Sequence, residues 1–229
     1  MQKINEEEVK KFWDKRAELY GKVPLESIVL FKTDETVKER DKKLKKTIDS
    51  LIPDKQQILE LGCSTGRLST HMAKRAKFVL GVDYSKPLLD IARKESEGIT
   101  NVVFIESDVS AFDYHDKFDI ILVSGLFHYL NDDKVKKTIK IIKKHLKTDG
   151  KVIIKESIGI KQRVEIIDKY SKEIHAKYNS IYRTKNEIIA LFSEEELVCL
   201  TDYNYLQHRK DTAIWFFIFK EEKNERKHI

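Results

Sequence analysis

The middle of the chain alternates short apolar runs with helical patterns, and this rhythm restricts the possible folds more than any other feature. Between Gln57 and Ser157 the apolar runs read ILELG, FVLGVD, VVFIES, FDIILVS and VIIKES, with helical patterns after the first, second and fourth. Strands that alternate with helices at this interval predict parallel βαβ units. Runs such as FDIILV are apolar throughout, as in strands that are buried on both faces. We therefore expect an α/β fold with a doubly wound parallel sheet.

Two helical patterns precede this region. Asn5 and the three glutamates after it begin the first, because acidic residues suit the positive end of a helix. The second covers about residues 36–51, and Pro53 ends it. Residues 1–52 are therefore predicted to form a helical N-terminal segment.

The rhythm breaks after Ser157. Residues 158–198 read as helical, with capping boxes at Thr184/Glu187 and Ser193/Glu196, so we expect a helical insertion there. The end of the chain returns to strand patterns, CLTDYNYLQH and TAIWFFIFK, which are typical of an antiparallel pair. Only three prolines and eight glycines are present and no stretch reads as a linker, so residues 1–229 are expected to form a single domain.

The composition argues against several classes of protein. Apolar residues make up 41% of the 229, which is enough for a core, but the longest apolar runs are far too short to span a bilayer. The N-terminus lacks the apolar stretch of a secretory signal. The two cysteines, Cys63 and Cys199, have no metal-ligand spacing, which fits a reducing compartment and argues against a disulfide scaffold or a zinc site. We expect a cytoplasmic protein that has no membrane partner.

The positive charge is weak evidence for a nucleic-acid partner. The formal net charge is +6, with 36% charged residues of both signs. The strongest basic run, residues 134–147, carries apolar residues at helical spacing, so most of its lysines fall on the outward face of a helix. A solvated helix face explains this run better than an RNA-binding surface.

Three successive strand ends carry residues that suit an adenosine-containing ligand. Gly62 and Gly66 lie in a turn between the first strand and its helix, where glycine lets the backbone approach a ligand. Asp83 ends the second strand, where a carboxylate can accept both ribose hydroxyl protons, and Asp108 follows the third. Ser64 stands where a dinucleotide-binding loop has its second glycine, which favours a ligand without a pyrophosphate.

In these residues the chain resembles the class I S-adenosylmethionine-dependent methyltransferases. Their first motif reads acidic-x-Gly-x-Gly-x-Gly, and Glu60, Gly62 and Gly66 match it while Ser64 replaces the middle glycine. The resemblance covers residues 56–157 and the final strand pair. It implies a Rossmann-like seven-stranded sheet in the order 3-2-1-4-5-7-6 with an antiparallel last strand, S-adenosylmethionine as the cofactor, and no metal.

The resemblance also implies roles for individual residues in binding the cofactor. The N-terminal helix with Tyr20 resembles the segment that covers the cofactor in many members, so residues 1–52 are expected to form a lid. The other cofactor positions that it implies are Gly62 and Cys63 near the methionine part, Asp83 on the ribose, Tyr84, Asp108 and Val109 at the adenine, and Ser124 beneath the sulfonium.

Missing motifs narrow the class of methyl acceptor. The fourth strand ends in Ser124-Gly-Leu-Phe127 and has no Asn/Asp-Pro-Pro-aromatic motif, with which nucleic-acid amino methyltransferases hold an exocyclic amine. Neither cysteine is placed to attack cytosine, and the paired glutamates of arginine methyltransferases are absent there. Asp132 and Asp133 precede a helix, so they are better explained as its cap and first turn than as metal ligands.

A small polar acceptor remains, bound between the N-terminal helices and the 158–198 insertion. His128, four residues after Ser124, is the candidate general base, and Glu156 at the end of the fifth strand is a second candidate. The insertion supplies candidate acceptor-binding residues that suit a polar molecule with an anionic group, namely His175, Tyr178, Tyr182 and Arg183. The predicted function is methyl transfer to O or N of a small molecule. An RNA or protein methyltransferase and a non-catalytic cofactor-binding regulator stay open as alternatives.

Overall fold

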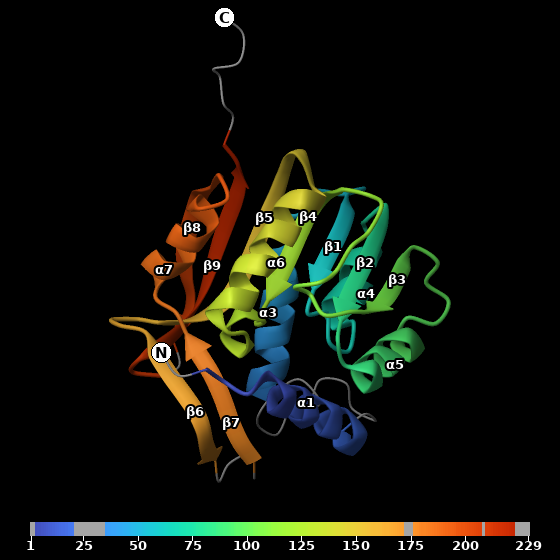
Figure 1. Cartoon of the computed structure of the whole chain (residues 1–229). Coiled ribbons are helices and arrows are strands. Elements are labelled where there is room, and N and C mark those ends of the chain that lie inside the picture. The colour runs from blue at the N-terminus through green and yellow to red at the C-terminus, as the bar shows by residue number, and fades with distance from the viewer. Residues whose placement is uncertain (1–2, 21–34, 172–175, 208, 223–229) are drawn as a thin grey trace, which may run out of the picture.

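The computed structural model describes residues 3–20, 35–171, 176–207 and 209–222, and its centre is a seven-stranded sheet (Figure 1). The strands lie in the order β3 (Val102–Glu106), β2 (Phe78–Asp83), β1 (Gln57–Leu61), β4 (Phe118–Ser124), β5 (Leu146–Gly159), β9 (Thr212–Glu221) and β8 (Leu197–Gln207). The first five are parallel, and β9 is antiparallel to both of its neighbours. Without the separate pair β6 and β7, this is the predicted order 3-2-1-4-5-7-6, which is confirmed.

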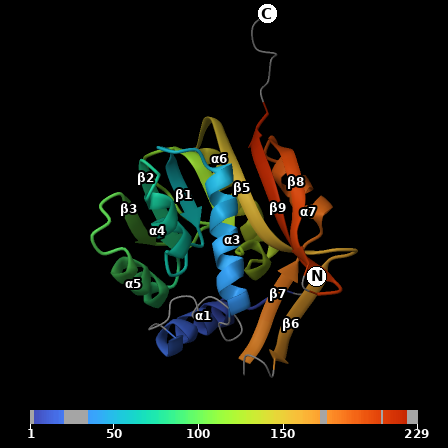
Figure 2. The same ribbon diagram turned by 180° about the vertical axis from the view of Figure 1, so that it is seen from behind.

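Helices cover both faces of the sheet, as a doubly wound fold requires (Figures 1 and 2). One face carries α3 (Glu35–Leu51), α4 (Arg67–Ala73) and α5 (Lys86–Glu95), and the other carries α6 (Asp132–His145) and α7 (Lys185–Ser193). Alternate strand residues supply the two cores. Ile120 and Leu122 of β4 pack toward the first group of helices, whereas Ile121 and Val123 pack toward the second. The central strands are therefore apolar throughout because both of their faces are buried.

The N-terminal helix α1 (Glu6–Tyr20) lies at the edge of the sheet where the parallel strands end (Figure 1). Asn5 caps it, since its side-chain oxygen accepts the backbone N–H groups of Glu7 and Glu8 at 3.1 and 3.2 Å. Both predicted N-terminal helices, α1 and α3, are present in the structure.

The prediction of a helical insertion over residues 158–198 is wrong. After β5 the chain forms a β-hairpin of β6 (Val164–Ser171) and β7 (Ala176–Tyr182), which extends beyond the carboxyl edge of the sheet beside α1 (Figures 1 and 2). Among the described residues of this region, only those of α7 form a helix, and its capping box at Thr184 and Glu187 is present as predicted. The second box is absent, because Ser193 ends α7 and Glu196 has a φ of 58° immediately before β8.

A bulge explains why the hairpin is hard to recognise in the sequence. The pairing register shifts between Ile166 and Lys169, where Asp168 takes a φ of 48° and its N–H donates to the side chain of Asn179 at 3.0 Å. This irregularity interrupts the alternation of apolar and polar residues that marks a strand.

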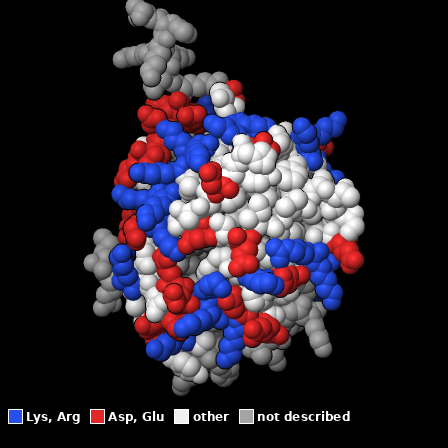
Figure 3. Space-filling view, turned by 45° about the vertical axis from the view of Figure 1, so that its right-hand side comes forward, with Lys and Arg blue, Asp and Glu red and all other residues white. Residues whose placement is uncertain are grey.

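The lysines of α6 are paired with acidic side chains on neighbouring elements. Lys136, Lys140 and Lys143 form ion pairs with the acidic run at residues 194–196 after α7, and Lys144 pairs with Asp113. Figure 3 shows basic and acidic side chains interleaved on the molecular surface. The basic run in the sequence is therefore largely neutralised in the fold. In the part of the chain that the structure describes, no helix is long and apolar enough to cross a membrane.

Candidate active site

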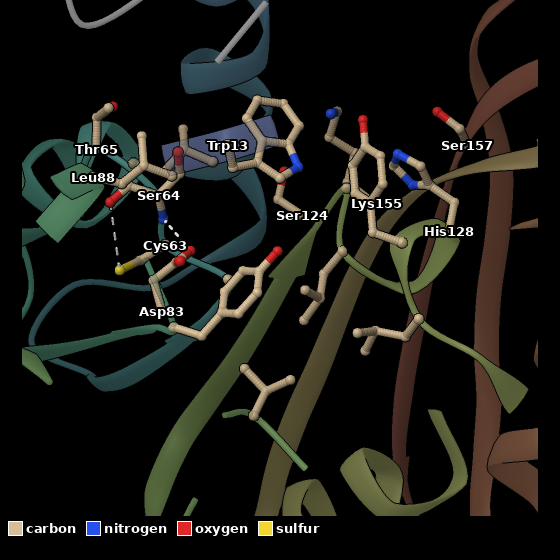
Figure 4. Close-up of a pocket in the computed structure, with 18 of the residues that line it drawn as sticks. Trp13, Cys63, Ser64, Thr65, Asp83, Leu88, Ser124, His128, Lys155 and Ser157 are labelled. Carbon is tan, nitrogen blue, oxygen red and sulfur yellow. Dashed lines mark hydrogen bonds between the residues drawn. The ribbon is translucent and has the colours of Figure 1, made fainter. Parts of the chain in front are cut away.

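A cavity of about 890 Å³ lies at the carboxyl edge of the sheet, bounded by the ends of β1, β2, β4 and β5 and covered by α1 and the β6–β7 hairpin. Figure 4 shows Asp83 and Cys63 at one end of the view, His128 and Ser157 at the other, and Ser124 between them. Eleven of the predicted site residues line this cavity: Glu60, Gly62, Cys63, Asp83, Tyr84, Asp108, Val109, Ser124, His128, Tyr178 and Tyr182. The side chain of Tyr20 and the whole of His175 lie outside the described residues.

The turn after β1 brings backbone groups to the cavity through left-handed conformations. Gly62, Ser64 and Gly66 have φ values of 74°, 54° and 66°. A Cβ atom at Gly66 would lie 2.5 Å from the ring of Phe104, so only glycine fits there. Ser64 also adopts the left-handed conformation, which normally favours glycine. Serine therefore occupies the position of the middle glycine at the cost of some backbone strain.

Two hydroxyl groups of this turn are buried and have no hydrogen-bond partner among the described residues. They belong to Ser64 and Thr65, and both residues line the cavity. A buried polar group without a partner is unfavourable, so these hydroxyls suit a polar ligand that would satisfy them.

Asp83 holds the end of β2 against the turn after β1. One carboxylate oxygen accepts the N–H of Ser64 and the other accepts the N–H of Ser85, both at 2.9 Å. The side chain is only 5% exposed, and burial raises the pKa of this carboxyl to about 6. A carboxylate at this position can accept further hydrogen bonds from a ligand in the cavity.

Glu60 and Cys63 lie beneath the turn and are shielded from water. The Ser69 hydroxyl donates to Glu60 at 2.5 Å, and burial raises the pKa of Glu60 to about 8. Burial also raises the pKa of the Cys63 thiol well above its ordinary value, so Cys63 is not an activated nucleophile.

Charged contacts fasten α1 to the loops that follow β2 and β3. The Ser85 hydroxyl donates to Asp14 of α1 at 2.5 Å. Lys134 lies between two carboxylates, 2.7 Å from Asp108 and 2.8 Å from Glu6 of α1. Therefore α1 is attached beside both Asp83 and Asp108, the two acidic residues that the sequence assigned to the ligand.

His128 and Glu156, which the sequence offered as separate candidates, form one hydrogen-bonded pair. The Glu156 carboxylate contacts Nδ1 of His128 and accepts the N–H groups of Phe127 and Ser157 at 2.7 and 2.8 Å. Burial alone would raise the pKa of this carboxyl, but a protonated His128 and the hydrogen bonds from His128, Ser157 and Phe127 together lower it below its ordinary value. Since an ionised carboxylate only accepts, Nδ1 carries the proton, and Nε2 of a neutral ring is left as the basic nitrogen. Glu156 itself does not line the cavity.

Aromatic side chains surround His128. Its ring stacks on Tyr182 with centroids 5.6 Å apart, and Tyr129 lies 4.0 Å away on a tilted plane. The hydroxyl groups of Tyr178 and Tyr182 are hydrogen-bonded to each other at 2.8 Å. Trp13 of α1 packs edge-on against Tyr129 and completes this aromatic wall of the cavity.

Arg183, a predicted acceptor-binding residue, does not line the cavity. Its guanidinium is 1% exposed and lies outside the cavity, where it donates to the carbonyl oxygens of Phe127 and Leu130 at 2.7 and 2.9 Å and to Asp132 at 2.8 Å. These contacts hold both ends of η1 (Phe127–Tyr129), the short 3-10 helix that carries His128. The sequence could not show that the backbone of another loop accepts the hydrogen bonds of this guanidinium.

The sequence analysis missed Lys155, which lines the cavity between Ser124 and His128 (Figure 4). A lysine within the apolar run VIIKES was the available signal, because a charge inside a strand that is buried on both faces needs an explanation. Among the described residues, no group of three or more His, Cys, Asp or Glu side chains could hold a metal ion.

Comparison with known proteins gives the chain a family context. Residues 58–150 match the family model described as a methyltransferase domain. Phosphoethanolamine N-methyltransferase 1 of Zea mays is 29% identical over 153 residues, which are 65% of this chain and 29% of that protein. The chain thus spans less than a third of the length of this relative.

Solved structures share the fold at low sequence identity. The DhpI–SAH complex is 15% identical, with a TM-score of 0.68 over 94% of this chain and 96% of that one. Coclaurine N-methyltransferase bound to N-methylheliamine and SAH is 14% identical, with a TM-score of 0.69 over 83% and 74%. These similarities confirm the predicted methyltransferase fold.

The role of Arg183 can be tested by removing its charge. Arg183→Met leaves two buried carbonyl groups without their donor, so we expect the free energy of unfolding to fall by about 3 kcal/mol in urea titrations. Lys140→Met removes an exposed lysine of α6 and should change it by less than about 0.5 kcal/mol. Wild-type stability of Arg183→Met would show that the guanidinium does not hold η1.

Proposed function

We propose that the chain is a class I S-adenosylmethionine-dependent methyltransferase that transfers a methyl group from S-adenosylmethionine to O or N of a small polar acceptor. The observation that carries this proposal is the single cavity that connects Asp83 and Asp108 with His128. It offers a donor site and an acceptor site on one continuous wall.

The residues at the Asp83 end fit S-adenosylmethionine. Asp83 would accept the ribose hydroxyls, while Asp108, Val109 and Tyr84 would contact the adenine. The turn at Gly62 and the unpartnered hydroxyls of Ser64 and Thr65 would face the methionine part. The similar structures are complexes with SAH, which supports S-adenosylmethionine as the methyl donor.

The residues at the other end fit an acceptor that loses a proton. When bound, S-adenosylmethionine supplies a methyl group on a sulfonium, from which an acceptor O or N displaces the neutral thioether. In our proposal Nε2 of His128 takes the acceptor proton, and Glu156 keeps the proton of the ring on Nδ1 and stabilises the imidazolium that forms. The aromatic wall excludes water from the reacting atoms.

A small acceptor is favoured over RNA or protein. The lysines of α6 are neutralised by ion pairs, and α1 and the hairpin cover the carboxyl edge of the sheet. The maize relative and the coclaurine enzyme are both named as N-methyltransferases of small molecules, which favours nitrogen as the methylated atom.

The donor half of the proposal predicts a pH dependence of cofactor binding. An ionised Asp83 accepts the ribose hydroxyls better than a protonated one, so calorimetric affinity for S-adenosylhomocysteine should rise about tenfold as the pH increases from 5 to 7.5 through the pKa near 6. The same raised pKa means that the contribution of Asp83 to folding stability is present at low pH and lost as the pH rises through about 6. The Asp83→Asn variant should bind S-adenosylhomocysteine about thirtyfold more weakly than the wild type at pH 7.5, and its affinity should no longer depend on pH in this range. A pH profile that is unchanged in Asp83→Asn would rule out this contact.

The catalytic half is tested with labelled methyl donor and metabolite extracts, followed by mass identification of the product. His128→Ala should lower kcat at least about a hundredfold, and Glu156→Gln about tenfold, because the base or its orientation is lost. Affinity for S-adenosylhomocysteine should stay within about twofold of the wild type in both variants. Cofactor binding without any methylated product would favour a regulator, and full turnover in His128→Ala would remove the base from the mechanism.

A further inference from the structure

Lys155 lies where the donor and acceptor sites of the proposed function meet. It is opposite Ser124 in the pairing of β5 with β4, and its carbonyl oxygen accepts the N–H of Gly125 at 2.8 Å. Its side chain lines the cavity beside the aromatic wall, and Figure 4 shows it between Ser124 and His128. The backbone of a central strand therefore fixes the point from which this ammonium reaches the cavity.

The ammonium of Lys155 has no carboxylate within ion-pair distance among the described residues. The pKa of Lys155 is lowered to about 8. Burial is the main cause and the positive charge of Arg67 adds to it, while the attraction of Glu156 acts in the opposite direction. Glu156 is already engaged by His128 and two backbone N–H groups. A partly buried ammonium without a counter-charge is costly unless a ligand supplies that charge.

Several other charged side chains of the cavity wall are paired with one another. Asp41 pairs with Arg67 and Lys45, and Asp14 pairs with Lys10. Lys134 neutralises both Glu6 and Asp108. What remains at the acceptor end is positive.

Arg209, in the turn between β8 and β9, adds to this positive charge. It lines the same cavity and has no ion pair among the described residues. A sulfonium donor would bring further positive charge into the cavity. Attraction by Lys155 and Arg209 therefore favours an acceptor that carries a negative group.

We propose that Lys155 binds an anionic group of the methyl acceptor, a carboxylate or a phosphate, while the acceptor's nucleophilic atom faces His128. The proposal rests on the methyltransferase function argued above and makes Lys155 a determinant of substrate specificity. The ammonium offers three hydrogen-bond donors, and the hydroxyl groups of Ser157 and Tyr178 on the same wall can add others. Small amines or alcohols that lack an anionic group would leave the ammonium unsatisfied and would bind poorly.

Calorimetry with simple anions tests this without knowledge of the acceptor. Protein saturated with S-adenosylhomocysteine is titrated with inorganic phosphate, acetate and the neutral analogue acetamide. We expect one of the two anions to bind and acetamide not to bind. Lys155→Met should weaken anion binding at least tenfold, and Lys155→Arg should restore most of it. Lys151→Met, which removes an exposed lysine of the same strand, is the matched control and should bind like the wild type.

The anion that binds identifies the anionic group of the methyl acceptor. Binding of phosphate indicates a phosphate ester, and binding of acetate indicates a carboxylic acid. Absence of binding by both anions, or equal binding by the wild type and Lys155→Met, would overturn the proposal while leaving the methyltransferase function intact. Failure of the wild type to bind S-adenosylhomocysteine would instead contradict the proposed function.

A second measurement uses only the wild-type protein, in case Lys155→Met is unstable. Formaldehyde with sodium cyanoborohydride methylates neutral amines without releasing phosphate or acetate, and the modified lysines are identified by mass spectrometry. The anion that binds should slow modification of Lys155 at pH 8 at least threefold and leave Lys151 unaffected. Equal modification of Lys155 with and without the anion would contradict the assignment.

Discussion

The buried Glu156 carboxylate is the interaction on which the acceptor side of the structure depends. It joins the end of β5 to the loop after β4 by accepting two backbone N–H groups and the Nδ1 proton of His128. Arg183 holds the same loop from the opposite side through two carbonyl groups. A buried anion and a buried cation thus fix η1 without contacting each other, and the imidazole between them has little freedom to turn.

This arrangement also connects the hairpin to the site. Arg183 follows β7 directly, and Asp132 at the start of α6 contacts both Arg183 and Arg163, which precedes β6. Movement of the hairpin would therefore disturb η1. The hairpin does more than cover the cavity, because it supplies part of the support that orients His128.

The donor side is built from a different kind of interaction. Its key contacts are local, between a carboxylate at the end of one strand and backbone N–H groups of the adjacent turns, as at Asp83. The N-terminal helix adds long-range contacts through Asp14 and Lys134. These contacts hold α1 beside Asp83 and Asp108 at this end of the cavity.

The sequence by itself determined that strands alternate with helices in a parallel sheet, and that Gly62, Asp83 and Asp108 follow three successive strands. These predictions depend on short-range patterns, namely apolar runs, glycines that allow positive φ, and acidic residues at consecutive strand ends, which a parallel sheet brings to one edge. The order of the strands came from the resemblance to the class I methyltransferases. Only the tertiary structure decided the rest. The bulge at Asp168 interrupts the strand pattern, so the β6–β7 hairpin could not be recognised from the sequence. The pairing of β4 with β5 places Lys155 beside Ser124. Whether a buried charge such as Arg183 faces a ligand or a carbonyl group depends on contacts between residues more than fifty positions apart, which no local pattern records.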